Sequence, residues 1–170
     1  MAEAIIVMGV AGSGKTTVGL RLAKALSCPF RDGDDFHTAA NIARMSRGEP
    51  RNDDDRQPWL FRLRDLMEDA LRDRTSIVIG CSALRESYRA MLLPRNAALA
   101  AQVKFIWLRI LPETATQRLH SRPGHFMQAS MIESQFAALE EPRDAIVLDA
   151  AQPVDDVVTC ALQALRTGHS

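Results

Sequence analysis

The chain has 170 residues, 46% hydrophobic and 25% charged, which is an ordinary composition for one globular domain. Its formal net charge is zero, with 21 acidic and 21 basic residues, so the composition does not indicate a protein that binds nucleic acid or an anionic membrane. No apolar run approaches the roughly 18 residues of a membrane span, and three cysteines without metal-ligand spacing (Cys28, Cys81 and Cys160) indicate reduced thiols in a cytoplasmic protein.

The first predicted element is a strand over Ala4–Met8, because this run is apolar and rich in β-branched residues. The glycine-rich sequence GVAGSGKT follows at Gly9–Thr16, and apolar residues at helical spacing predict a helix from there to about Leu26. Since the chain enters a strand at once, we expect no signal peptide.

The sequence Gly9–Thr16 has the Gly-x-x-x-x-Gly-Lys-Thr pattern of a phosphate-binding loop, and it lies between a strand and a helix, as such a loop requires. Glycines let the backbone approach a ligand closely, and a helix N-terminus favours anions. Lys15 would reach the β- and γ-phosphates of ATP, and the Thr16 hydroxyl would hold Mg²⁺. The candidate nucleotide-binding residues of this loop are Gly9, Val10, Ala11, Gly12, Ser13, Gly14, Lys15 and Thr16.

A short strand is expected over Cys28–Arg31, and it leads into the acidic cluster Asp32–His37. Asp34 is a candidate general base for an acceptor hydroxyl, or a carboxylate that holds Mg²⁺ through water. His37 could hydrogen-bond a polyol substrate. The alternatives are a solvated acidic turn and an incidental histidine.

The next stretch is expected to hold two helices, over Ala39–Arg47 and Trp59–Leu71, and a buried strand over Ser76–Gly80. Between the helices, Asp53–Arg56 is either a charged surface turn or, because Pro58-Trp59-Leu60 anchors it to the core, a turn with a functional or fold-closing role. No aspartate follows the strand, so we expect Thr16, phosphate oxygens and water to hold the metal.

The second half of the chain continues to alternate helices and strands. Helices are expected over Leu84–Arg95, from Pro112 to about Ser121, from a capping box at Ser130 and Glu133 to before Pro142, and from Pro153 onward. Strands are expected over Val103–Leu108 and Ala145–Leu148. This alternation predicts an α/β fold of three layers, with a central parallel sheet of about five strands.

Arg118, Arg122, His125 and Phe126 lie in a segment with proline and glycine, between two expected helices. In small kinases such a segment is a lid, and Arg118 and Arg122 are candidates to close over the phosphates and to stabilise the charge that develops during transfer. The alternative is a pair of surface arginines. Because ligands of parallel sheets bind at the carboxyl ends of the strands, we expect the phosphate loop, Asp32–His37 and Gly80–Leu84 to converge on one site.

These motifs together resemble those of the bacterial-type gluconate kinases (gluconokinases), which are small P-loop kinases related in fold to shikimate and nucleoside monophosphate kinases. The resemblance runs from about Ile5 to Pro153. The motifs that carry it are GVAGSGKT (Gly9–Thr16), DGDDFH (Asp32–His37), NIARMSRGEPRNDDDRQPWL (Asn41–Leu60), CSALRESYR (Cys81–Arg89), RPGHFM (Arg122–Met127) and SQFAALEEP (Ser134–Pro142).

The resemblance implies one P-loop kinase domain over residues 1–170, with a helical lid at about 118–136 and a substrate-binding segment at about 34–60. It implies a cytoplasmic, homodimeric enzyme that uses ATP and Mg²⁺ to phosphorylate D-gluconate to 6-phosphogluconate. Lys15, Asp34 and Arg122 are then the catalytic residues, and Arg118 and Arg122 also bind the nucleotide. The implied substrate-binding residues are Asp34, His37, Arg56, Ser82, Arg85, Arg89 and His125, of which an arginine (Arg56, Arg85 or Arg89) would bind the carboxylate in bidentate fashion.

Two other kinds of P-loop protein remain as alternatives. A shikimate kinase would be expected to show a glycine triplet after the third strand, where this chain has Gly80-Cys81-Ser82-Ala83. A nucleotide-binding switch protein, which hydrolyses GTP slowly, would be expected to recognise guanine through an Asn-Lys-x-Asp motif. No Asn-Lys pair occurs in the sequence.

Overall fold

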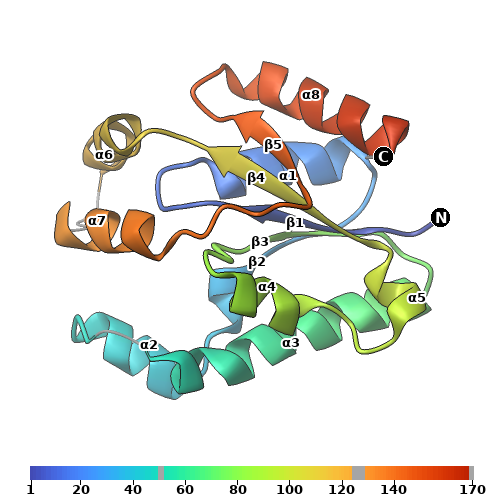
Figure 1. Cartoon of the computed structure of the whole chain (residues 1–170), viewed down its shortest axis with the longest axis horizontal. Helices are drawn as coiled ribbons and strands as arrows, with labels where there is room; N and C mark the ends of the chain where they lie inside the picture. Colours follow the sequence, from blue (N-terminus) through green and yellow to red (C-terminus); the bar gives the residue numbers. More distant parts are fainter. Residues whose placement is uncertain (50–51, 124–128, 169–170) are drawn as a thin grey trace.

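A parallel sheet lies at the centre of the structure, a computed structural model that describes residues 1–49, 52–123 and 129–168. Within these residues the sheet has five strands in the order β2-β3-β1-β4-β5, as Figure 1 shows. The strands are β1 (Ala4–Met8), β2 (Phe30–Asp32), β3 (Ile77–Gly80), β4 (Val103–Arg109) and β5 (Ala145–Asp149). All neighbouring strands pair in parallel, which confirms the expected sheet.

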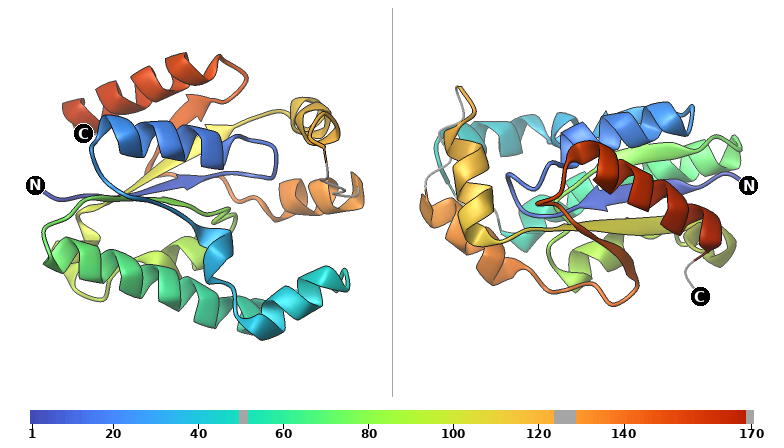
Figure 2. Two further views of the ribbon diagram at one scale, coloured as in Figure 1. Left: turned by 180° about the vertical axis from the view of Figure 1, so that it is seen from behind. Right: turned by 90° about the horizontal axis from the view of Figure 1, so that it is seen from above.

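Helices cover both faces of the sheet and form the outer layers. Helices α1 and α8 lie on one face, α3 and α4 lie on the other, and α6 and α7 lie beyond the carboxyl ends of the strands (Figure 1 and Figure 2). The helices are α1 (Lys15–Ala25), η1 (Gly33–Phe36, a 3₁₀ turn), α2 (Ala39–Ser46), α3 (Asp53–Arg72), α4 (Glu86–Leu92), α5 (Ala97–Ala100), α6 (Pro112–His120), α7 (Ala129–Ala138) and α8 (Val154–Thr167).

The central strand β1 is apolar at every position because it contributes to two cores. Ile5 and Val7 pack into the core beneath α1 and α8. Ile6 and Met8 point the other way and pack against Leu63 and its neighbours on α3. A strand covered on both faces is expected to lack the usual alternation of apolar and polar residues.

Helix α3 begins at Asp53, six residues before the start predicted at Trp59, so Asp53–Arg56 is the first turn of a helix and the prediction of a separate turn was wrong. Asn52 and Asp55 form a reciprocal capping box, in which each side chain accepts a hydrogen bond from the other residue's backbone N–H. Carboxylates in a first helical turn are favoured by the helix dipole. The acidic run that looked like a solvated turn is therefore a helix start.

Two other predicted elements begin at different residues in the structure, and one helix was not predicted at all. Strand β2 covers Phe30–Asp32, two residues later in its start than the predicted Cys28–Arg31. The short helix α5 was not predicted. Helix α7 begins at Ala129, so Ser130 lies inside the helix and is not its cap. Within the described ranges, none of the helices combines the length and apolarity that crossing a membrane requires.

Candidate active site

The loop after β1 has the backbone geometry of an anion cradle. Gly9, Gly12 and Gly14 take positive φ angles of 150°, 81° and 95°, a region that favours glycine. No side chain caps the start of α1 at Gly14, so the first N–H groups of the helix are left for a ligand. In the described part of the chain, the buried Ser13 hydroxyl also makes no hydrogen bond. These donors fit a bound polyphosphate.

Lys15 lies at the mouth of this loop, and its Nζ donates a hydrogen bond to the backbone oxygen of Val10 at 3.0 Å. Burial lowers the pKa of Lys15, and the carboxylate of Asp34 opposes this shift more than any other charged group. The guanidinium of Arg122 is also near enough to lower the pKa of Lys15. The charges of Asp34 and Arg122 therefore both act on Lys15, and their joint catalytic role stays a prediction.

Asp32 is a candidate site residue that the sequence analysis did not single out. Its Oδ2 accepts a hydrogen bond from Thr16 Oγ1 at 3.1 Å, and its Oδ1 accepts one from the backbone N–H of Asp34 at 3.0 Å. Asp32 thus links the predicted metal-binding hydroxyl to the turn that carries Asp34. Its position as the last residue of β2, next to the phosphate loop, was the signal that could have identified it.

Asp34 is exposed, with 84% of its side chain accessible, and lies beside a buried histidine. Nε2 of His37 is 3.4 Å from Asp34 Oδ1, and only 1% of the His37 side chain is exposed. The His37 ring stacks on Trp59, whose Nε1 donates a hydrogen bond to the backbone oxygen of Gly33 at 2.7 Å. The buried ring thus packs against Trp59 and lies beside Asp34, and its predicted hydrogen bond to a polyol stays a prediction.

Two of the predicted arginines meet in a charged cluster at the start of α3 and α4. Arg56 Nη1 donates a hydrogen bond to Tyr88 Oη at 2.8 Å, and Tyr88 Oη donates one to Asp53 Oδ1 at 2.5 Å. Arg56 and Arg85 each lie 3.7 Å from a carboxylate oxygen of Asp53. Burial and the bond to Asp53 raise the pKa of Tyr88. This cluster has a net charge of one positive unit, which suits a ligand with a single carboxylate. Its members are Asp53, Arg56, Arg85 and Tyr88.

Arg89 does not share this exposed position. Its side chain is buried, and Nη1 donates hydrogen bonds to the backbone oxygens of Ala83 and Leu84 at 2.9 and 3.1 Å. Burial lowers the pKa of Arg89. That Arg89 binds the substrate carboxylate stays a prediction; in the structure its guanidinium holds the backbone of the loop between β3 and α4.

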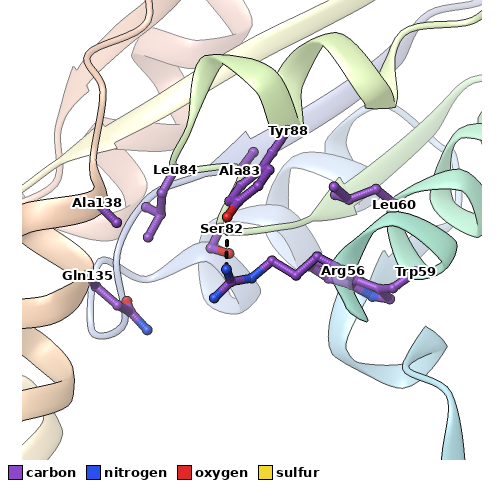
Figure 3. A pocket seen from close by; sticks show the side chains of 9 residues that line it. All are labelled: Arg56, Trp59, Leu60, Ser82, Ala83, Leu84, Tyr88, Gln135 and Ala138. Atoms are coloured by element: carbon purple, nitrogen blue, oxygen red, sulfur yellow. Dashed lines mark hydrogen bonds between the residues drawn. The ribbon is translucent and has the colours of Figure 1, made fainter. Parts of the chain in front are cut away.

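A small pocket of about 70 Å³ lies between these groups, as Figure 3 shows. Ser82, predicted on the substrate side, is one of its lining residues, and Arg56 enters it from α3 (Figure 3). Gln135 enters from α7, on the opposite side (Figure 3). The residues that line the pocket are Arg56, Trp59, Leu60, Ser82, Ala83, Leu84, Tyr88, Gln135 and Ala138.

Arg118 and Arg122, the two arginines predicted for the lid, lie in different parts of the structure. Arg118 Nη2 donates a hydrogen bond to the backbone oxygen of Ala150 at 2.6 Å, at the loop between β5 and α8. Arg122 is exposed at the end of α6, on the side of Lys15. His125, the remaining predicted lid residue, lies outside the described residues.

Comparisons with known proteins agree with this geometry. The family model described as "AAA domain" matches residues 5–145. The chain is 40% identical to the thermosensitive gluconokinase of Escherichia coli (strain K12) over 167 residues, which cover 96% of this chain and 87% of the relative. It is 39% identical to the thermoresistant gluconokinase of the same organism, over 96% of this chain and 93% of the relative. The crystal structure of a gluconokinase from Sinorhizobium meliloti 1021 superposes with a TM-score of 0.83 at 39% identity, over 97% and 92% of the two chains.

Proposed function

The chain belongs to the gluconokinase family, and from this premise we propose that it transfers the γ-phosphoryl group of ATP to the 6-hydroxyl of D-gluconate, giving ADP and 6-phosphogluconate. The observation that carries the proposal is the link from Thr16 through Asp32 to the backbone of Asp34, because it sets the turn that bears the Asp34 carboxylate beside the loop that would hold the phosphates.

ATP is proposed to bind the loop Gly9–Thr16. Its phosphates would take the free N–H groups at the start of α1, with Lys15 releasing Val10 to contact the β- and γ-phosphates. Arg118 would approach the nucleotide beside the loop after β5, and Arg122 would close over the phosphates from the lid, at about residues 118–136.

Mg²⁺ is proposed to lie at the Thr16–Asp32 pair. The Thr16 hydroxyl and the Asp32 carboxylate supply oxygen ligands, which suit a hard divalent cation. They lie within hydrogen-bonding distance of each other beside the phosphate loop. Thr16 would hold the ion, and Asp32 would act on it directly or through water. When bound, Mg²⁺ would neutralise part of the charge on the phosphates.

Asp34 is proposed as the general base that orients the acceptor hydroxyl and removes its proton. Its exposure leaves it accessible to substrate, and the buried His37 would fix its direction. The acceptor itself would lie along the segment at about residues 34–60 and the loop after β3.

The substrate carboxylate is proposed to bind Arg56 and Arg85, with Ser82 on the same side. A guanidinium suits a carboxylate because its N–H groups form paired hydrogen bonds. Both arginines lie beside Asp53 and Arg56 also lines the pocket, whereas Arg89 donates hydrogen bonds to the backbone of the loop between β3 and α4. His125 stays a prediction for the lid side of the substrate.

We also propose that the enzyme is a homodimer and acts in the cytoplasm. The cysteines Cys28, Cys81 and Cys160 are free thiols, which is typical of a reducing compartment. Light scattering coupled to size-exclusion chromatography tests the assembly: a single species of about 38 kDa, twice the chain mass of 18.8 kDa, is expected. A species of single-chain mass would contradict it.

A coupled assay of ADP release tests the activity. Purified protein receives ATP and Mg²⁺ with gluconate, shikimate or AMP, and in a further reaction GTP alone. Turnover with gluconate only is expected. Turnover with shikimate or AMP instead would assign the chain to another small-molecule kinase, and hydrolysis of GTP alone would indicate a switch protein.

A further inference from the structure

The segment Ser134–Pro142, at the end of α7 and just beyond it, contacts two separate loops of the site. The side-chain oxygen of Gln135, Oε1, accepts a hydrogen bond from the backbone N–H of Ala11, in the phosphate loop, at 2.7 Å. Five residues later, Glu140 donates its backbone N–H to the oxygen of Leu84 at 2.8 Å and accepts the N–H of Glu86 on Oε2 at 2.6 Å. The segment therefore joins the phosphate loop to the loop between β3 and α4.

The bond to Ala11 determines which way the Gln135 amide faces. A backbone N–H is a donor, so the Gln135 atom next to it is the oxygen, and the two N–H bonds of the amide point elsewhere. Gln135 lines the same pocket as Arg56 and Ser82, and Figure 3 shows it opposite Arg56. The amide is thereby held as a neutral hydrogen-bond donor at the pocket.

This donor complements the groups already assigned to the substrate. Arg56 and Arg85 suit a carboxylate, but a sugar acid also carries a chain of hydroxyl groups that need neutral partners. A side chain fixed at one end by the phosphate loop would place a hydroxyl at a set position relative to the phosphates.

We propose that Gln135 is a specificity-determining residue for the acceptor: its amide N–H donates to a hydroxyl of the sugar acid while its oxygen stays on the N–H of Ala11. This proposal rests on the proposed function, because it names a contact to the same substrate.

The experiment compares kcat/KM for gluconate with that for each mono-deoxygluconate, in the unaltered enzyme and in Gln135→Met, which has a similar shape and no amide. For at least one analogue that keeps the 6-hydroxyl, we expect kcat/KM of the unaltered enzyme to be about tenfold lower than for gluconate, as for the loss of one hydrogen bond. In Gln135→Met, kcat/KM for that analogue and kcat/KM for gluconate should agree within about twofold. Gln163→Met, an exposed residue on α8, is the matched control and should discriminate as the unaltered enzyme does.

A second variant separates the donor from the contact with the loop. Gln135→Glu keeps an oxygen for the Ala11 N–H but has no N–H to donate, so it should also lose the discrimination. Its negative charge affects absolute rates, which is why the ratio between two substrates is compared. Thermal unfolding of each variant, expected within a few degrees of the unaltered protein, controls for structural damage.

Two results would overturn the proposal while leaving the proposed function intact. One is a Gln135→Met enzyme that discriminates every analogue as the unaltered enzyme does. The other is a variant in which only the KM for ATP changes, which would make Gln135 a nucleotide-loop contact alone. Absence of gluconate turnover by the unaltered enzyme would instead overturn the proposed function, and this inference with it.

Discussion

The imidazole ring of His37 stacks on the indole ring of Trp59, with ring centroids 4.4 Å apart and an interplanar angle of 25°. Both rings are buried, and the imidazole presents Nε2 to Asp34. Trp59 is in turn fixed by its hydrogen bond to the backbone of Gly33, which adjoins Asp34 in the chain. A buried aromatic pair therefore supports an exposed carboxylate.

The first prediction concerns this support. Replacing His37 with Gln should reduce kcat about 10- to 100-fold, because a small displacement of a reacting group has an effect of that size. The KM for ATP should change little. In the double variant with Asp34→Asn, no further loss is expected, since the histidine acts through the aspartate. Losses that multiply in the double variant would show that His37 contributes independently of Asp34.

The second prediction compares two adjacent carboxylates. Asp34→Asn should lower kcat by about 10²- to 10⁴-fold, as is typical when a general base is removed. Asp35→Asn is the matched control because Asp35 is also exposed and lies in the same turn, and its kcat should stay within about twofold. Steady-state kinetics with gluconate measure both. An Asp34→Asn enzyme with nearly normal kcat would exclude the base assignment.

The third prediction concerns Asp32 and the metal. In Asp32→Asn, a negative charge is lost and one of the two accepted hydrogen bonds, from Thr16 or from the N–H of Asp34, is weakened. The Mg²⁺ concentration for half-maximal rate should rise about tenfold or more, as for a lost hydrogen bond to a charged group. Asp35→Asn again serves as the control. An unchanged Mg²⁺ requirement would place the metal away from Asp32.

The fourth prediction separates the arginines. Arg56→Lys should raise the KM for gluconate about tenfold, because lysine cannot form the paired hydrogen bonds of a guanidinium. Arg89→Lys should mainly lower the melting temperature, since the buried Arg89 holds the backbone of Ala83 and Leu84. A larger effect on gluconate KM from Arg89→Lys than from Arg56→Lys, at unchanged melting temperature, would reverse these roles.

The fifth prediction concerns alkaline pH. Burial raises the pKa of Cys81 from 9.0 to about 12 in the folded chain. Between these two values the folded protein holds a proton that the unfolded chain has lost, so the free energy of unfolding should fall as pH rises through this window. The expected slope from this one group is up to about 1.4 kcal/mol per pH unit.

Cys81→Ala removes this contribution, so its unfolding free energy should decline less steeply than that of the unaltered protein between about pH 9 and about pH 11. Denaturant titrations at several pH values measure the slope. Cys160→Ala is the control because Cys160 is exposed. Parallel curves for the unaltered and Cys81→Ala proteins would contradict the prediction.

Local sequence patterns were sufficient to predict the sheet and the phosphate loop. The buried strands β1 and β3 are short apolar runs, and Gly9–Thr16 follows the first of them directly, so neighbouring residues carry the whole signal. The start of α3 was missed although Asn52 and Asp55 stand at capping-box spacing. An acidic run at that point is equally compatible with a solvated turn until its hydrogen bonds are known.

The missed site residues depend on contacts between distant parts of the chain. Asp32 was identified by its bond to Thr16, sixteen residues away, and Gln135 by its bond to Ala11, at a separation of 124 residues. Arg85 and Arg89 belong to one motif and lie four residues apart, yet of the two only Arg89 is buried. Local composition carries no information on such pairings or on which of two arginines the fold encloses.

The edge position of β2 has a consequence for how the two halves of the site open. Among the residues that the structure describes, this three-residue strand pairs with β3 alone, whereas β1 is paired on both sides. Amide protons of β2 should therefore exchange with solvent at a lower opening free energy than those of β1. On this basis we expect the turn after β2, which carries Asp34, to open more readily than the phosphate loop after β1.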